Sequence, residues 1–103
     1  MEVDILGTKY KLIDDAQLDK DTDGVCAFYS KEIHIRPVEQ MLSGDGTMTE
    51  KYERRKEVIR HEIAHAYLYE SGLTTLAQDE TPVEWLATNF PKMLQTFQLV
   101  GGL

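Results

Sequence analysis

The chain has 103 residues, which is enough for one domain and too short for two. Its hydrophobic fraction of 42% and charged fraction of 28% are typical of a globular protein and exclude a disordered or collagen-like chain. The net charge of −7, from 18 acidic and 11 basic residues, argues against nucleic-acid binding, which requires clustered Lys and Arg.

Nothing in the sequence predicts secretion or membrane insertion. The apolar runs are only a few residues long, whereas a membrane span needs roughly 20. The first residues lack the basic region and apolar stretch of a signal peptide. The single cysteine, Cys26, permits no internal disulfide, and we expect it to be a buried structural thiol. We therefore predict a cytoplasmic protein with no membrane contact.

Two β-hairpins are predicted in the first half of the chain. Residues 3–13 alternate between apolar and polar types around Gly7, which permits a tight turn. The polar, acidic segment 14–23 is predicted to be mostly loop. Residues 24–29 and 32–36 form the second hairpin, because apolar and polar side chains alternate again in its last strand.

The middle of the chain is predicted to be helical. A short turn of helix at 38–42 and a flexible loop at 43–47 come first. A helical pattern then covers residues 49–71, and Gly72 is well placed as the C-terminal stop of this helix. Residues 73–80 are predicted to be a connection.

A last helix is predicted to open at Thr81 and to run to about Val100. Thr81 can cap this helix, Pro82 fits its first position, and Glu84 can complete a capping box. Pro91 is expected to kink it.

The sequence His61-Glu62-Ile63-Ala64-His65 is an H-E-x-x-H motif inside the central predicted helix. Residues four apart differ by about 40° around a helix axis, so both imidazoles project from one face and can bind one zinc ion. Glu62 is turned aside from the two ligands. As general base, it can accept the proton of a zinc-bound water and pass that proton to the leaving amine.

The helix that carries the motif is apolar on both sides. Val58 and Leu68 share the face of the histidines, whereas Ile59 and Ile63 cover the opposite face. Such a helix is expected to be buried between two layers, where a metal site is screened from bulk water. Packed histidines that bind no metal are the alternative interpretation.

A catalytic zinc site needs a third protein ligand. The downstream candidates are Asp79, Glu80 and Glu84. If the next helix returns antiparallel to the first, Glu84 near its start completes a His-His-Glu set with His61 and His65. Glu80, just before that helix, is the alternative, and capping alone is another possible role for Glu84.

These features resemble the small gluzincin-type zinc metallopeptidases of phage and mobile-element origin, the ImmA/IrrE-like group. The resemblance covers about two-thirds of the chain, from Gly24 to Phe90. It is carried by the strand at 32–37, the helical segment 60–66 and the segment 84–90. The first helical motif is specific, whereas the last segment is short and degenerate.

The resemblance implies a zincin-like fold in which His61, His65 and Glu84 bind zinc and Glu62 is the general base. It also implies that the substrate is a peptide or protein. The chain departs from the family pattern by placing prolines on both sides of the last segment, which leaves the choice between Glu80 and Glu84 open.

The segment from Asp19 to Gly24 matches the D-x-D-x-D-G start of a calcium-binding EF-hand loop, with Asp21 and Asp23 as its other carboxylates. The twelfth position of such a loop should hold a bidentate Glu and is Ser30 here. An acidic turn is therefore the preferred interpretation, and weak cation binding is the alternative.

Tyr29, Tyr69 and His34 are candidates to stabilise the oxyanion that forms during peptide hydrolysis. His34 lies on the polar face of its predicted strand, which Pro37 ends or restricts to a sheet edge. An edge strand beside the metal can also receive an extended peptide. The sequence does not choose among the three candidates, and an ordinary solvent-exposed histidine is the alternative for His34.

The sequence as a whole predicts one α+β domain over residues 1–103. We expect a small antiparallel sheet built from two hairpins, a buried H-E-x-x-H helix and a C-terminal helix. The expected function is zinc-dependent peptide hydrolysis. A zinc-stabilised regulatory module of phage origin that binds a partner without catalysis is the alternative.

Overall fold

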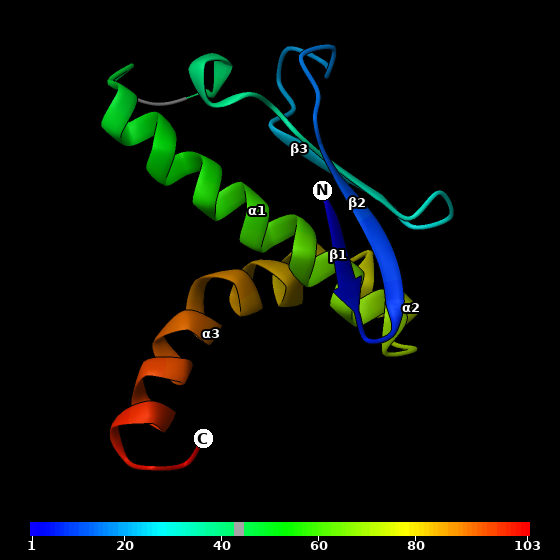
Figure 1. The fold of residues 1–103 in the computed structure, drawn as a ribbon, viewed down its shortest axis with the longest axis vertical. Coiled ribbons are helices and arrows are strands. Elements are labelled where there is room, and N and C mark those ends of the chain that lie inside the picture. The colour runs from blue at the N-terminus through cyan, green and yellow to red at the C-terminus, as the bar shows by residue number, and fades with distance from the viewer. Residues whose placement is uncertain (43–44) are drawn as a thin grey trace.

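The computed structural model describes residues 1–42 and 45–103, so the predicted loop at 43–47 lies partly outside the described residues. The architecture is α+β, as expected, with a four-stranded sheet packed against helices (Figure 1). No helix in the described part of the chain has both the length and the apolar character that a membrane span requires.

Strands β1 (Glu2–Ile5) and β2 (Thr8–Asp14) form the first predicted hairpin. The two residues of the turn both have positive φ, 52° at Leu6 and 91° at Gly7. Positive φ at both positions matches the twist of the flanking strands, and glycine adopts it without steric cost.

Strands β3 (Gly24–Ala27) and β4 (Glu32–Ile35) form the second hairpin, but the sheet is mixed. The strand order is β1-β2-β4-β3, and β4 pairs with β2 in parallel. The prediction of an antiparallel sheet is therefore wrong at this pairing. The physical reason is burial. Ile33 and Ile35 on β4 are fully buried, and an interior position between β2 and β3 covers them, whereas Val25 on the edge strand β3 is exposed.

The strand that carries His34 is likewise not at the sheet edge. It lies between β2 and β3, so the edge strands of the sheet are β1 and β3. Pro37 ends β4 rather than restricting it to an edge, and it precedes the short 3-10 helix η1 (Val38–Gln40). This turn of helix agrees with the helical turn predicted at 38–42.

Helix α1 (Met48–Glu70) agrees with the predicted central helix to within one residue at each end. The hydroxyl of Thr47 caps it by accepting a hydrogen bond from the backbone N–H of Glu50 at 3.2 Å. Gly72 follows its end with a φ of 90°, as expected of a helix stop. A short helix that the sequence did not predict, α2 (Thr74–Ala77), comes next.

Helix α3 (Glu80–Leu99) begins two residues earlier than predicted because Asp79 caps it. The carboxylate of Asp79 accepts a hydrogen bond from the backbone N–H of Thr81 at 3.0 Å. Thr81 is therefore not the cap, and Pro82 occupies the third helical position instead of the first. Pro91 lies inside α3, and the helix bends at mid-length in Figure 1.

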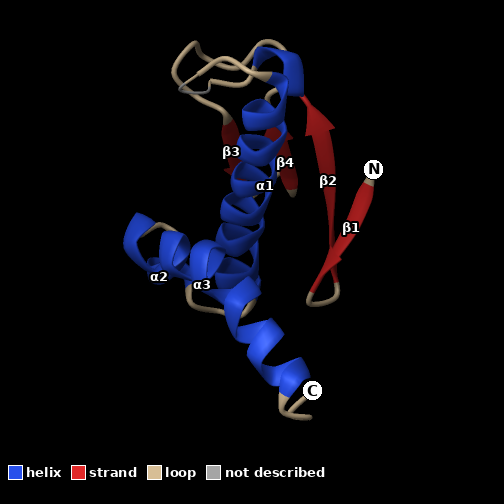
Figure 2. Ribbon diagram, turned by 90° about the vertical axis from the view of Figure 1, so that its left-hand side faces the viewer, coloured by secondary structure: helices blue, strands red, loops and turns tan. Residues whose placement is uncertain are grey.

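The hydrophobic core lies between the sheet and α1. Its centre is formed by fully buried side chains of three elements, among them Tyr10, Ile33 and Ala66. Figure 2 shows α1 between the sheet on one side and α2 and α3 on the other. The prediction that α1 is buried between two layers is thereby confirmed, and the H-E-x-x-H motif lies in its buried second half.

Candidate metal centre

His61 and His65 project from the same side of α1, as their spacing predicts. Their ring centroids are 4.9 Å apart. The Nε2 atom of each ring faces the carboxylate of Glu80, at 2.7 Å for His61 and 3.2 Å for His65. These three residues form a group whose potential ligand atoms all lie within 4.8 Å of one another, so the group could hold a metal ion.

The other nitrogen of each ring is held by a hydrogen-bond acceptor. Nδ1 of His61 lies 2.7 Å from the carboxylate of Glu84, and Nδ1 of His65 lies 2.6 Å from the carbonyl oxygen of Ala77. Burial raises the pKa of Glu84, but hydrogen bonds with His61 and Thr88 outweigh this and lower it overall. The carboxylate of Glu84 and the carbonyl oxygen of Ala77 therefore have no proton to donate. In both hydrogen bonds Nδ1 of the histidine is the donor.

This donor pattern determines what can occupy the space in front of the rings. A neutral imidazole with its proton on Nδ1 presents a lone pair at Nε2. Two such lone pairs and the carboxylate of Glu80 repel one another unless a positive charge lies between them. An extra proton or a divalent cation meets this need. Two imidazoles and one carboxylate suit zinc and leave a fourth position open, so these residues fit the ion.

The two helices after α1 bring the remaining groups to the histidines. Gly72 ends α1, and α2 then places the carbonyl group of Ala77, a fully buried residue, against His65. The first two turns of α3 carry Glu80 and Glu84, which lie on one side of that helix because they are four residues apart. After α2, the first half of α3 runs antiparallel to α1, as expected, with Glu80 beside His65, Glu84 beside His61 and Ala87 beside Arg60.

The structure places the alternative ligand, Glu80, in front of the Nε2 atoms, and it places Glu84 on the Nδ1 side of His61. Glu84 also accepts a hydrogen bond from the hydroxyl of Thr88 at 3.1 Å. It takes no part in capping α3, a role that Asp79 fills. Both glutamates thus contact His61, and the assignment of Glu84 as a metal ligand stays a prediction.

Glu62 is only 7% exposed and faces the same space. Within the described residues its carboxylate has no hydrogen-bond or ion-pair partner. Burial raises the pKa of Glu62, although the neighbouring His65 and His61 partly oppose this effect. A buried carboxyl group without a partner and with a raised pKa is suited to proton transfer rather than to a structural role.

Strand β3 lies close to α1 at Gly24. A Cβ atom at this position would stand 2.6 Å from Cγ1 of Val58 and 2.9 Å from Cγ of Glu62. Glycine therefore allows the strand to lie beside the motif and to confine the side chain of Glu62. This role of Gly24 was not predicted from the sequence, although a glycine in a strand is a signal of close backbone approach.

A cleft of about 580 Å³ opens between α1, β3 and the start of α3. We refer to it as the α1–β3 cleft. His61, Glu62 and His65 line it from α1, and the side chains of Glu80 and Glu84 line it from α3. These last two side chains are 69% and 64% exposed, so the candidate metal centre is open to solvent on the α3 side.

The tyrosines predicted as oxyanion stabilisers are not among the described residues that line the α1–β3 cleft. The ring of Tyr69 stacks on Phe28 with centroids 4.3 Å apart. Tyr29 is 94% exposed in the turn between β3 and β4. Phe28 does line the cleft, with its ring 6.3 Å from that of His65, and the sequence analysis did not identify it.

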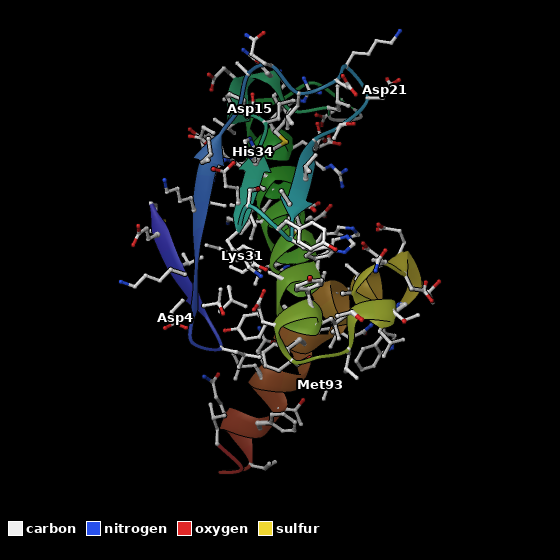
Figure 3. The ribbon with its side chains drawn as sticks, turned by 90° about the vertical axis from the view of Figure 1, so that its right-hand side faces the viewer. Asp4, Asp15, Asp21, Lys31, His34 and Met93 are labelled. Carbon is white, nitrogen blue, oxygen red and sulfur yellow. The ribbon has the colours of Figure 1, made fainter. Side chains whose placement is uncertain are left out.

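His34 lies outside the cleft as well, in an ion-pair cluster of its own. Its Nδ1 is 2.8 Å from the carboxylate of Asp15, and its Nε2 is 2.9 Å from that of Glu32. Figure 3 shows His34 close to Asp15. The hydrogen bond with Glu32, helped by Asp15, raises the pKa of His34. This histidine is therefore neither a free surface residue nor a neighbour of the candidate metal centre.

The acidic loop before β3 surrounds an arginine side chain instead of a metal ion. Asp23 is buried, and its carboxylate pairs with Arg36 at 3.0 Å and with Arg54 at 3.1 Å. Arg36 also donates hydrogen bonds to the carbonyl oxygens of Asp19 and Thr22. Because two guanidinium groups neutralise Asp23, the structure supports an acidic turn over calcium binding.

Cys26 lies on β3 and is partly buried. Burial raises the pKa of its thiol to about 12, and the nearby charges of Glu62 and Glu70 add to this effect. A thiol with so high a pKa is a poor nucleophile at neutral pH, in keeping with the structural role predicted for it.

No family model, curated protein or solved structure matches this chain. The function is therefore inferred from the residues and their geometry.

Proposed function

We propose that the protein is a zinc-dependent peptidase in which His61, His65 and Glu80 bind the ion. The observation that carries this proposal is the convergence of the two Nε2 atoms and one carboxylate on one point, while both Nδ1 atoms are already engaged. Metal-binding histidines are oriented in the same way, by an acceptor on the nitrogen that does not bind the metal.

Zinc bound there supplies a Lewis acid that polarises the peptide carbonyl and makes a nearby water molecule more acidic. Glu62 removes a proton from the attacking water, whose oxygen forms a bond to the carbonyl carbon. When the C–N bond breaks, Glu62 returns this proton to the leaving amine. The raised pKa of Glu62 makes its carboxylate a better acceptor for this proton.

The neighbours of the histidines act as positioning groups in this proposal. Glu84 and the carbonyl group of Ala77 hold the two rings so that Nε2 of each faces the centre. The contact between Gly24 and Glu62 keeps the carboxylate beside them.

A peptide substrate is supported by the position of β3. This strand lies at the edge of the sheet and lines the α1–β3 cleft through Gly24, Val25 and Cys26. An extended peptide can pair with the free edge of such a strand. From the sequence, this role was predicted for the strand that carries His34, but that strand lies inside the sheet.

The proposal is tested by metal analysis of protein purified without added metal, which should contain close to one zinc per chain. Glu84→Gln removes a positioning carboxylate and should weaken zinc binding by about 10- to 100-fold. Glu80→Gln removes a ligand and should weaken zinc binding by more than that. The reverse order would make Glu84 the ligand. Zinc binding that is unchanged by His65→Ala would contradict the site itself.

The alternative function, a zinc-stabilised module that binds a protein without cleaving it, is favoured by one observation. Among the described residues that line the cleft there is no tyrosine and no third histidine to stabilise an oxyanion. A protein that contains zinc and binds peptides but releases no new amino groups from them would support this alternative.

A further inference from the structure

The side chains that line the α1–β3 cleft are strongly biased in charge. Within the described residues they include one cation, Arg54, and six carboxyl groups, which belong to Asp21, Asp23, Glu57, Glu62, Glu80 and Glu84. Arg36, which pairs with Asp23, adds one positive charge to that of Arg54, and a divalent ion at the histidines would add two more. The total of four positive charges is smaller than the six negative charges of the carboxylates. The lining therefore stays negative, and it favours a cationic ligand.

The cleft has two distinguishable ends because β3 runs alongside α1 in the same direction. Gly24 at the start of the strand lies against Val58 and Glu62. Phe28, just beyond its end, lies against His65. The candidate metal centre is therefore flanked by one end near the start of β3 and another near Phe28.

The end near the start of β3 is acidic. Arg54 is anchored at 3.1 Å to the buried carboxylate of Asp23, and its contact with Glu57 is longer, at 3.5 Å. The side chain of Glu57 is 59% exposed. Asp21 is exposed and forms no ion pair within residues 1–42 and 45–103. Glu57 and Asp21 are thus available to a basic group of a ligand.

The opposite end is apolar. Its lining includes the half-buried ring of Phe28 and the fully buried Ala77. The ring of Phe28 is held in place by stacking on Tyr69. An aromatic or aliphatic side chain of a ligand would remove this surface from water.

A separate observation indicates that the cleft receives a ligand at its centre. Glu62 is more than nine-tenths buried, faces the cleft and forms no hydrogen bond or ion pair within the described residues. A buried carboxyl group is costly when it stays without a partner, which points to a group that enters the cleft.

We propose that the α1–β3 cleft selects an extended peptide with a basic side chain toward Asp21 and Glu57 and an apolar side chain toward Phe28. This inference rests on the proposed peptidase function and specifies its substrate class. Glu57 lies four residues before His61, or about 6 Å along the helix axis. An extended chain rises about 3.3 Å per residue, so the basic residue is expected about two residues from the bond at the metal centre.

The experiment uses zinc-loaded protein and peptides that differ only in Lys, Ala or Glu at the positions two residues to either side of a central bond. Cleavage is measured with the wild-type protein, and binding is measured with Glu62→Gln, which is expected to hold peptides intact. The Lys peptide should be preferred over the Glu peptide by about fivefold or more, since partly exposed ion pairs contribute modestly.

A charge reversal with a matched control tests the assignment to Glu57. Glu57→Lys should reverse the preference, so that the Glu peptide binds better. Glu53→Lys makes the same change in charge one turn earlier on α1, where the side chain is 64% exposed and outside the cleft lining. This control should leave the preference within about twofold of wild type.

The apolar end is tested in the same way. Phe28→Ala should weaken binding of a peptide with an aromatic residue by about tenfold, because a large apolar contact is lost. Tyr29→Ala removes a neighbouring ring that is 94% exposed and should have no such effect.

The outcomes separate this inference from the peptidase proposal. Equal binding of the Lys and Glu peptides, or an equal effect of Glu53→Lys and Glu57→Lys, would overturn the inference even if peptides are cleaved. Charge-selective binding without cleavage would overturn the peptidase proposal and leave the inference standing. If no peptide is bound and none is cleaved, both the inference and the peptidase proposal are overturned.

Discussion

The three histidines of this protein lie in two settings that combine imidazole and carboxylate groups differently. His34, on the outer face of the sheet, has a separate carboxylate on each ring nitrogen. His61 and His65, on α1, each have one acceptor on Nδ1, and their Nε2 atoms converge on Glu80. In the first arrangement a single ring lies between two carboxylates, whereas in the second two rings share one carboxylate.

This difference shows that geometry rather than residue type decides what a histidine can do. Carboxylates on both sides of His34 favour its protonated form, and a protonated ring has no lone pair to offer a metal. At the motif, the Nε2 atoms of two rings point to the same carboxylate, that of Glu80, so one ion can be held by all three residues. The predictions below test this contrast.

The largest effect is expected for Glu62→Gln. Loss of a general base should reduce peptide hydrolysis by about 10²- to 10⁴-fold while zinc stays bound. His34→Gln, at the other histidine cluster, should leave both hydrolysis and zinc content unchanged. Cleavage assays and elemental analysis of the two variants check this, and loss of zinc in Glu62→Gln would make that residue a ligand.

Removal of metal should have the next largest effect, this time on stability. A ligand present at 100 to 1,000 times its dissociation constant stabilises the folded state by about 2.7 to 4.1 kcal/mol. Thermal unfolding with and without chelator should show this difference for the wild-type protein and for His34→Ala. It should vanish in His65→Ala, and a chelator-insensitive wild-type protein would rule out a bound metal.

The close packing of β3 against the motif is tested by Gly24→Ala. The added Cβ would clash with Val58 and Glu62, and overpacking of this kind costs about 1 to 3 kcal/mol in the free energy of unfolding. Gly102→Ala is the control, because its Cβ would meet no atom closer than 3.7 Å. Urea unfolding of both variants measures the difference, and equal stability would mean that β3 moves away freely.

The smallest effect is expected at His34 and depends on pH. Because the folded state raises the pKa of His34, its contribution to stability is complete below its ordinary pKa of 6.5 and is lost as the pH rises through the raised value. His34→Gln should therefore destabilise the protein on the acidic side only, by less than about 1 kcal/mol because the pairs are partly solvated. Urea unfolding across this range checks the sign, and a deficit that grows with pH would contradict it.

Local features of the sequence were sufficient to predict several parts of the structure. The turn at Gly7, the helix stop at Gly72 and the common face of His61 and His65 all follow from residue types and spacing within a few positions. Each depends only on backbone geometry near the residues concerned, which is why the predictions agree with the structure. The α+β class follows from the same local patterns.

The tertiary structure alone decided the strand order and the surroundings of the motif. The parallel pairing of β2 with β4, the carbonyl group of Ala77 on His65 and the place of Glu80 in front of both rings join segments that are distant in the chain. A backbone carbonyl group is present at every residue, so the sequence does not indicate which one faces a histidine. Glu80 and Glu84 are one helical turn apart, and they are equivalent candidates for a metal ligand until the helix packs against α1. Spacing along the chain therefore determined which histidines can act together, and packing between elements decided which groups face them.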